Sequence, residues 1–301
     1  MAIPILQIYK NQLADSDFAQ GGCRAGAEKE KLLHSDRPLV SIITIVRNQE
    51  STLESTIQNV INQTYSSIEY ILVDGDSTDT TLNIIKKYDD VIDCWISSVD
   101  LNTSDAMNKG IALATGDLIG MVSAGDWYAD GALETVVKAH LEDREAVIHG
   151  KFHYWTEDLQ PQYVVAALDD TTENININHL AAFVPRKLYE EIGLFNLDFQ
   201  NGNDYEWYLR AKLKGAEFRY IDKVITNIRL GGMSDHKWWL NYYEIMQARI
   251  LHNQGRVSSY IRFVRMVIKT LSRKSLESLG LDSIVRAYRK YLAPIKKEME
   301  T

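Results

Sequence analysis

The chain has 301 residues, enough for one large α/β domain or two smaller ones, and 45% of them are apolar and 25% charged. This composition is typical of globular proteins and excludes disorder, a collagen-like repeat and a coiled coil as the main architecture. The net charge is −8, from 41 acidic and 33 basic side chains, so the chain lacks the basic surplus that displaces counterions from phosphates, and we expect no nucleic-acid partner.

Cysteines and apolar runs indicate where the protein works. The two cysteines, Cys23 and Cys94, are too few for a disulfide framework, which fits a reducing compartment. No run approaches the ~20 apolar residues of a membrane-spanning helix, and the apolar start of the chain is too short for a secretory signal. We therefore expect a cytoplasmic protein, which can still act as a peripheral protein at the inner face of the cell membrane.

Four apolar runs predict the strands of one sheet. Residues 1–37 show no sustained period, and we expect them to form an N-terminal arm. The runs that follow are rich in β-branched residues and apolar on both faces, as in parallel strands covered by helices on both sides. They are residues 39–46, 68–73, 91–96 and 118–122.

Helical segments alternate with these strands. Residues 51–63 have helical apolar spacing, with Ser51 as the expected N-cap and Glu54 as its capping-box partner. A second helix is expected from about residue 80, and residues 106–114 form a short third one. The alternation predicts an α/β fold with an open, mostly parallel sheet flanked by helices, and ligands of such sheets bind beyond the carboxyl ends of the strands.

The pattern is less regular beyond residue 150. Further strands are expected over 152–155 and 162–165, and helices over 185–192 and 204–213. From residue 237 the chain is helical and basic, with twelve bases and two acids between residues 249 and 297. Such a segment either buries its apolar face on its own domain or docks on an anionic membrane surface, and both interpretations stay open.

Acidic residues follow the predicted strands. Asp74 and Asp76 come after the second strand, Asp105 after the third and Asp126 after the fourth. Because the carboxyl ends of parallel strands meet at one edge of a sheet, we expect these carboxylates to converge on one crevice. Carboxylates placed there suit Mg²⁺ or Mn²⁺ that bridges a diphosphate. The alternative for any one of them is a turn or helix-capping residue.

Five sequence blocks occur in an order that identifies a family. The blocks are Ser41–Thr44 with Asn48, Tyr70–Thr81 (YILVDGDSTDTT), Asp105–Gly110 (DAMNKG), Ser123–Tyr128 (SAGDWY) and Asn203–Arg210 (NDYEWYLR). Together they resemble the family 2 glycosyltransferases, inverting enzymes with the nucleotide-sugar-binding fold called GT-A. The resemblance covers residues 38–235, and five ordered blocks are far more specific than one motif.

The resemblance implies which residues bind the donor. Asp74 would hydrogen-bond the nucleotide base, with Asp76 in the same turn, and a carboxylate that accepts from a ring N–H favours uracil or guanine. Asp105 would lie against the ribose or the diphosphate, with Asn108 and Lys109 nearby.

The resemblance also implies a metal-binding turn and a phosphate loop. The D-x-D turn of the family corresponds to residues 123–126, an N-A-G-D-type variant that keeps only the last acid. Asp126 would bind Mg²⁺ or Mn²⁺, with His236 as a further ligand, while Ser234 in the glycine turn would donate to the diphosphate. The alternative for Asp126 is the N-cap of a helix that starts near Trp127.

Asp204 corresponds to the general base of the family. Inverting transfer needs one carboxylate within ~3 Å of the acceptor hydroxyl, on the side opposite the leaving nucleoside diphosphate. The alternative for Asp204 is a helix-capping residue. Glu206 and Arg210 have the i, i+4 spacing of a surface pair.

The sequence predicts an inverting glycosyltransferase of bacterial surface polysaccharide or glycolipid biosynthesis. The donor is a nucleotide-diphospho-sugar, with a UDP-sugar favoured, and the acceptor is a saccharide or lipid-linked hydroxyl. A sugar nucleotidyltransferase is one alternative, although residues 46–50 contain no glycine for its phosphate loop. A non-catalytic nucleotide-sugar-binding relative is another, because the acidic turn has lost residues. The expected divisions are an arm (1–37), a GT-A catalytic domain (38–236) and a basic helical C-terminal extension (237–301).

Overall fold

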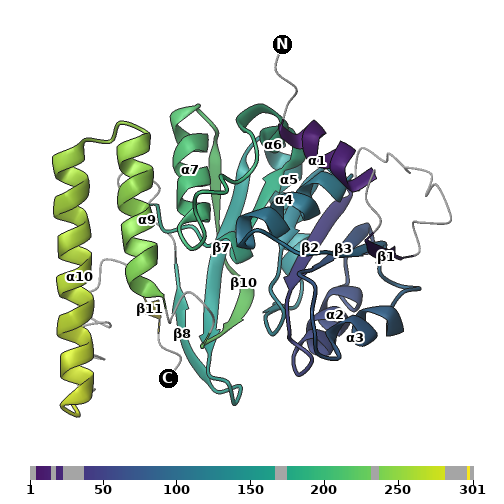
Figure 1. Cartoon of the computed structure of the whole chain (residues 1–301), viewed down its shortest axis with the longest axis horizontal. Coiled ribbons are helices and arrows are strands. Elements are labelled where there is room, and N and C mark those ends of the chain that lie inside the picture. The colour runs from purple at the N-terminus through teal and green to yellow at the C-terminus, as the bar shows by residue number, and fades with distance from the viewer. Residues whose placement is uncertain are drawn as a thin grey trace.

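The protein forms one mixed sheet with helices on both faces and two long helices at one end (Figure 1). The computed structural model describes residues 5–14, 18–22, 37–166, 175–231, 237–281 and 297–298. Two predicted site residues, Ser234 and His236, lie outside the described residues.

Four parallel strands form the half of the sheet that carries most of the predicted site. In spatial order they are β4 (Cys94–Ser97), β3 (Ile68–Asp74), β2 (Val40–Val46) and β5 (Leu118–Met121). The register pairs Asp74 with Val46 on one side and with Ser97 on the other, so the carboxyl ends of β2, β3 and β4 are level, whereas β5 ends opposite Ile43. The predicted strands are confirmed, although β4 begins at Cys94 instead of residue 91.

The other half of the sheet is more mixed than expected. It contains β9 (Ala182–Pro185), β7 (Val147–Trp155), β10 (Phe218–Arg229) and β6 (Trp127–Tyr128), while β8 (Pro161–Val165) pairs with β7 and with β11 (Lys297–Glu298). β7 and β10 are parallel, whereas β9 is antiparallel to both β5 and β7. A short 3-10 turn, η2 (His179–Ala181), leads directly into β9, and an antiparallel strand needs no crossover helix.

Helices cover both faces of the sheet. On one face lie α2 (Leu53–Ile61), α3 (Thr81–Lys87) and α5 (Ala132–Glu142), over a core that includes Leu53, Ile57 and Tyr70. On the other face lie α4 (Thr103–Leu113), α6 (Arg186–Ile192) and α7 (Asn203–Leu213), over a core that includes Trp207. Both cores consist of apolar side chains at the spacing of one helix face or of buried strands, which fixes the positions of the strand ends.

The predicted capping box of α2 is wrong. The residue before the helix is Thr52, and it makes no side-chain cap hydrogen bond. Glu54 instead accepts hydrogen bonds from Lys87 Nζ at 2.6 Å and from Tyr88 Oη at 2.8 Å, and so joins α2 to α3.

Residues 5–14 and 18–22 of the predicted N-terminal arm dock on the sheet domain. α1 (Ile5–Ala14) packs against α4, and β1 (Ala19–Gly21) adds to β4 as an antiparallel edge strand. Tyr9 of α1 is buried, and its hydroxyl donates to Asp105 Oδ1 at 2.7 Å. The arm therefore covers one of the predicted donor-binding residues.

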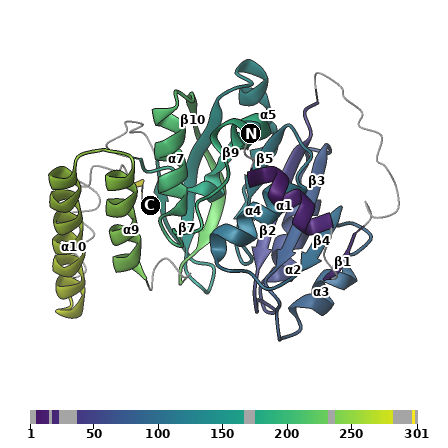
Figure 2. The same cartoon turned by 45° about the horizontal axis from the view of Figure 1, so that its top comes forward.

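The described residues 237–281 are helical, as predicted, and their two helices form a hairpin. α9 (Trp238–Leu251) packs between α7 and α10 (Arg256–Ser278), and the two helices stand at one end of the molecule (Figures 1 and 2). None of the helices in the described part of the chain is long and apolar enough to cross a membrane.

Candidate active site

Asp74 is buried at the end of β3 and fixes the turn that follows. Its carboxylate accepts hydrogen bonds from Ser97 Oγ at 2.6 Å and from both the backbone N and the Oγ of Ser77. Asp76 lies in this turn, exposed, with a φ of +57° that Asp tolerates better than most residues. Asp74 therefore lies at the predicted edge of the sheet, held in one orientation by serines of its own loops.

Lys109 joins the acids that follow β4. Its Nζ lies 2.7 Å from Oδ1 of Asp100 and 3.3 Å from Oδ2 of Asp105. Burial is the main reason that the pKa of Asp100 is raised; Lys109 opposes the rise, and the charges of Asp105 and Asp74 add to it. The acids that follow β3 and β4 therefore lie close enough to interact, while their convergence with Asp126 on one crevice stays a prediction.

The Asn108 side chain makes two hydrogen bonds with the backbone of Phe195. Its Nδ2 donates to the backbone O of Phe195 and its Oδ1 accepts from the backbone N of the same residue, both at 2.9 Å. The amide is buried and clamps α4 to the loop after α6. A contact between Asn108 and a donor stays a prediction.

A second group of side chains surrounds Asp126. Asp126 is buried, and its Oδ1 accepts from the backbone N of Arg229, the last residue of β10, at 2.8 Å. Burial raises the pKa of Asp126 to about 7, while the hydrogen bond from Arg229 and the charge of nearby His179 lower it. The alternative of a helix N-cap is wrong, because Trp127 and Tyr128 form β6 and the next helix starts only at residue 132.

His179 connects this group to Asp204. The imidazole Nδ1 lies 3.4 Å from Asp204 Oδ2, and both side chains are about one-fifth exposed, at 21% and 23%. Asp204 lies in the first turn of α7, where its Oδ1 accepts from the backbone N of Tyr205 at 2.7 Å. A carboxylate in this position is reachable by an acceptor and fixed by the helix.

The starts of α4 and α7 bring the two groups of acids to one side of the sheet. Asn203 Nδ2 donates to Ser104 Oγ at 3.0 Å, and these residues directly precede Asp204 and Asp105. The proposed base and the donor-side acids therefore lie on neighbouring helix ends, beyond the carboxyl ends of the parallel strands.

Two further residues of this region are not among those predicted from the sequence. Glu244 on α9 accepts three backbone N–H bonds through one carboxylate oxygen, at 3.0, 2.8 and 2.7 Å, from the successive residues 200–202 that lead into α7. Arg229 lies beside Asp126, and its Nε is buried without a hydrogen-bond partner in the described part of the chain. The glycine turn after Arg229 is a signal that could have identified it, whereas nothing in the local pattern marks Glu244.

The expected surface pair on α7 is buried. The Glu206 side chain is 2% exposed, and its Oε1 lies 2.9 Å from Arg210 Nε and 2.8 Å from His252 Nε2. Arg210 also donates to the backbone O atoms of Ile192 and Leu194. The pair therefore joins α7 to the end of α9 and to the loop after α6.

The residues around Asp126 fit a cation that is held mainly by its substrate. Among the residues that the structure describes, no three His, Cys, Asp or Glu side chains could hold a metal ion together. Asp126 is a buried carboxylate with little charge compensation, as its raised pKa shows, and a divalent cation would favour its ionised form. Such a cation would take its other ligands from diphosphate oxygens and water.

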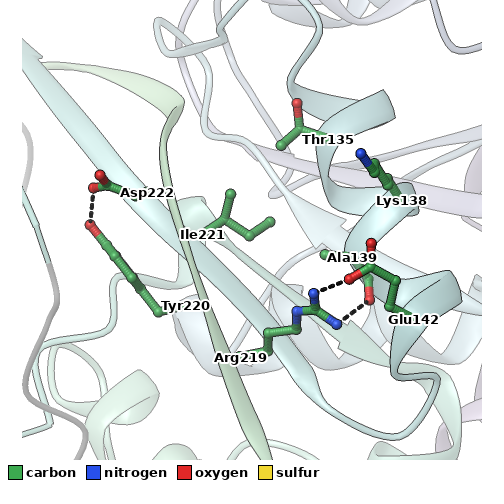
Figure 3. Close-up of a pocket in the computed structure, with 8 residues that line it drawn as sticks. All are labelled: Thr135, Lys138, Ala139, Glu142, Arg219, Tyr220, Ile221 and Asp222. Atoms are coloured by element: carbon green, nitrogen blue, oxygen red, sulfur yellow. Dashed lines mark hydrogen bonds and ion pairs between the residues drawn. The ribbon is translucent and has the colours of Figure 1, made fainter.

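A shallow pocket of about 300 Å³ lies elsewhere, between α5 and the start of β10 (Figure 3). Arg219 contacts Glu142 and the backbone O of Ala139 there, and Tyr220 Oη donates to Asp222. Because these residues begin β10 and Arg229 ends it, the pocket lies at the opposite end of the strand from Asp126 and contains no predicted site residue.

Known glycosyltransferases are similar to this chain in sequence. Residues 41–187 match the family model described as glycosyl transferase family 2. The chain is 26% identical over 209 residues to UDP-Glc:alpha-D-GlcNAc-diphosphoundecaprenol beta-1,3-glucosyltransferase WfaP of Escherichia coli, covering 66% of this chain and 81% of the relative. It is 25% identical over 251 residues to the putative teichuronic acid biosynthesis glycosyltransferase TuaG of Bacillus subtilis, covering 77% and 97%.

A solved structure shows the same fold over most of the chain. It is the mannosyltransferase PcManGT of Pyrobaculum calidifontis in complex with GDP-Man and Mn²⁺, with a TM-score of 0.56 and 15% identity, over 95% of this chain and 87% of that one. Residues 41–187, which match the family model, contain nearly all of β2, all of β3 to β9, and the residues of both acidic groups except Asp204 and Arg229. Residues 41–187, just under half of the chain, are therefore similar to glycosyl transferase family 2, and the chain is a glycosyltransferase with the GT-A fold.

Proposed function

We propose that the protein transfers a sugar from a nucleotide-diphosphate donor to an acceptor hydroxyl with inversion at the anomeric carbon. Asp204 takes the proton of the hydroxyl while the acceptor oxygen bonds to that carbon. The bond from the carbon to the diphosphate oxygen breaks, and the nucleoside diphosphate leaves with the electron pair. The observation that supports this best is the accessible Asp204 carboxylate beside His179, next to the group that contains Asp126.

A donor site on the acids of β3 and α4 is part of this proposal. Asp74 and Asp76 would face the base, which favours a UDP-sugar, in line with the UDP-Glc donor in the name of the Escherichia coli relative. The ribose and diphosphate would lie near Asp105, Asn108 and Lys109, with Ser234 as a further donor to the phosphates. The buried Nε of Arg229 suits a phosphate oxygen, because an unpaired buried N–H is costly and charged hydrogen bonds are strong.

Asp126 would hold Mg²⁺ or Mn²⁺, with His236 as a further ligand. When bound, the cation neutralises charge on the leaving diphosphate. The PcManGT complex with Mn²⁺ supports a divalent cation in this fold.

The acceptor side of the proposal is a saccharide or lipid-linked hydroxyl in bacterial surface polysaccharide or glycolipid assembly. The names of the two relatives support it, since one acts on a diphosphoundecaprenol-linked sugar and the other is assigned to teichuronic acid. We propose that the protein works at the cytoplasmic face of the membrane. In this proposal residues 38–236 form the catalytic domain, residues 1–37 its N-terminal arm and residues 237–301 its C-terminal extension.

Substitution of Asp204 tests the base. We expect Asp204→Asn to lower kcat at least about a hundredfold, the usual contribution of general-base catalysis, while donor affinity measured by calorimetry stays within a factor of two or so. Asp198→Asn, in the loop before α7, is the matched control with full activity. Wild-type turnover in Asp204→Asn would refute the base, and donor binding without transfer or hydrolysis in the wild type would indicate a binding-only relative.

A further inference from the structure

The outermost helix, α10, carries large apolar side chains on its solvent face. α10 packs on α9, where Tyr242 Oη lies 2.8 Å from Oγ1 of the buried Thr270, and it forms the edge of the molecule in both views (Figures 1 and 2). Six apolar side chains of α10 are 49–73% exposed, and we call them the apolar stripe. They are Val257, Tyr260, Ile261, Val264, Ile268 and Leu271.

The apolar stripe forms one continuous face. Its members recur every three or four residues, so at roughly 100° per residue they span about a third of the helix circumference. The buried Ser259 and Thr270 lie on the far side of the helix by the same geometry. α10 therefore has one face toward α9 and a second, apolar face toward solvent, and an exposed apolar surface of this kind marks an interaction site.

Bases border the apolar stripe on both sides. Helical geometry places Arg265 and Lys269 beside one edge of the stripe, and Arg256 and Lys274 beside the other. The two remaining bases, Arg262 and Arg273, lie farther round the helix, toward the side of Ser259 and Thr270. The helix contains only one acid, Glu277, in a protein whose net charge is −8.

This charge pattern selects one kind of partner. A second copy of α10 on the stripe would bring two sets of six bases together, with one acid per helix to offset them. A nucleic acid would attract the bases but leave the stripe in water. An anionic bilayer surface attracts the bases and buries the stripe at the boundary of headgroups and acyl chains.

We propose that the apolar stripe and its flanking bases form the surface by which the protein docks on an anionic membrane. Its purpose rests on the proposed function, because a lipid-linked acceptor is presented at such a surface. α9 provides the connection to the active site, since Glu244 binds the backbone that leads into Asp204. Docking through α10 would thus fix the position of the proposed base relative to the bilayer.

Vesicle sedimentation tests the docking surface without requiring turnover. The full chain is mixed with phosphatidylcholine vesicles that contain or lack phosphatidylglycerol. We expect the wild type to bind the anionic vesicles, more weakly as the salt concentration rises, and not to bind the neutral vesicles. Replacing Arg265 and Lys269 by Gln should weaken partitioning about fivefold for each base removed. Ile261→Ser with Ile268→Ser, at unchanged charge, should weaken it at least about tenfold.

Matched variants separate this surface from others. Lys138→Gln on α5 and Leu213→Ser at the end of α7 change an exposed base and an exposed apolar residue away from α10, and they should bind like the wild type. Asp204→Asn should also bind fully, so a failure of catalysis and a failure of docking give different results.

Three outcomes would overturn the docking surface. The first is a wild type that does not sediment with anionic vesicles. The second is loss of binding in the base variant but not in the stripe variant, which would indicate a surface for a polyanion. The third is a dimer in light scattering that the stripe variant converts to monomer, which would assign the stripe to a second copy of the chain. Circular dichroism of each variant checks that the exposed substitutions leave the fold intact.

Discussion

At the scale of single residues, the acids of the candidate site differ in how many hydrogen bonds their carboxylates accept from the protein. Asp74 and Asp105 each receive several hydrogen bonds from the protein, whereas Asp126 receives one backbone N–H and lies buried. The same residue type therefore serves as a fixed acceptor at the end of β3 and at the start of α4, and as a destabilised charge after β5. A destabilised carboxylate is the one that gains most from a cation.

The Asp126 carboxylate should make stability depend on pH. Its pKa is about 7 in the folded protein and 3.8 in an unfolded one, so the folded state holds the extra proton between these values. Stability without ligands should fall as pH rises from 4 to 7, by up to roughly 4 kcal/mol. Asp126→Asn keeps the acceptor for Arg229 and should be more stable than the wild type at pH 8 but not at pH 4.

Urea unfolding at several pH values measures this effect. Asp158→Asn, an exposed substitution, is the control and should follow the wild type throughout. Identical pH dependence in wild type and Asp126→Asn would show that the burial of this carboxylate has no energetic consequence.

At the scale of elements, α9 is part of the machinery that positions α7. One carboxylate oxygen of Glu244 receives three successive backbone N–H groups, and Glu206 of α7 receives His252 just beyond the end of α9. The loop before Asp204 is therefore held by α9, a helix of the predicted C-terminal extension.

Removing this contact should affect both stability and catalysis. Glu244→Ala leaves three N–H groups without their acceptor, and we expect a loss of about 2–4 kcal/mol in unfolding free energy. Because the loop leads into Asp204, kcat should fall more than donor affinity, which calorimetry and initial rates separate. Glu217→Ala, exposed before β10, is the control. A stable Glu244→Ala variant with normal kcat would contradict the positioning role.

The elements also show what local sequence could and could not predict. The parallel strands and the acids at their ends follow from β-branched runs and turn residues, which are local signals. The docking of Tyr9 on Asp105 and of Glu244 on residues 200–202 joins segments far apart in the chain, and no local period encodes such a partner. For the same reason the local pattern does not predict β9 and β10, which pair with strands that are distant in sequence.

At the scale of the whole molecule, the proposed donor site, the proposed base and the C-terminal hairpin form one connected structure. Donor binding should stabilise all of it, because a ligand that binds only the folded state raises the melting temperature. We expect a UDP-sugar to raise it more than a GDP-sugar, and Mn²⁺ or Mg²⁺ to increase the shift for the preferred donor. At a hundredfold excess over Kd the gain is about 2.7 kcal/mol.

A thermal-shift series with UDP-, GDP- and dTDP-sugars, each with and without cation, measures the preference. Asp74→Asn should reduce the shift, and Asp158→Asn should not. Equal shifts for all nucleotides, or shifts that Asp74→Asn leaves unchanged, would contradict base recognition by Asp74.

The Glu244 carboxylate also limits how the protein can be shortened. Cutting the chain at residue 236, between the catalytic domain and the extension that the sequence suggests, would discard the acceptor of three amide hydrogens beside the proposed base. A shortened enzyme should keep α9 and end after His252, which retains the Glu244 contact and removes α10 with its exposed apolar stripe and β11.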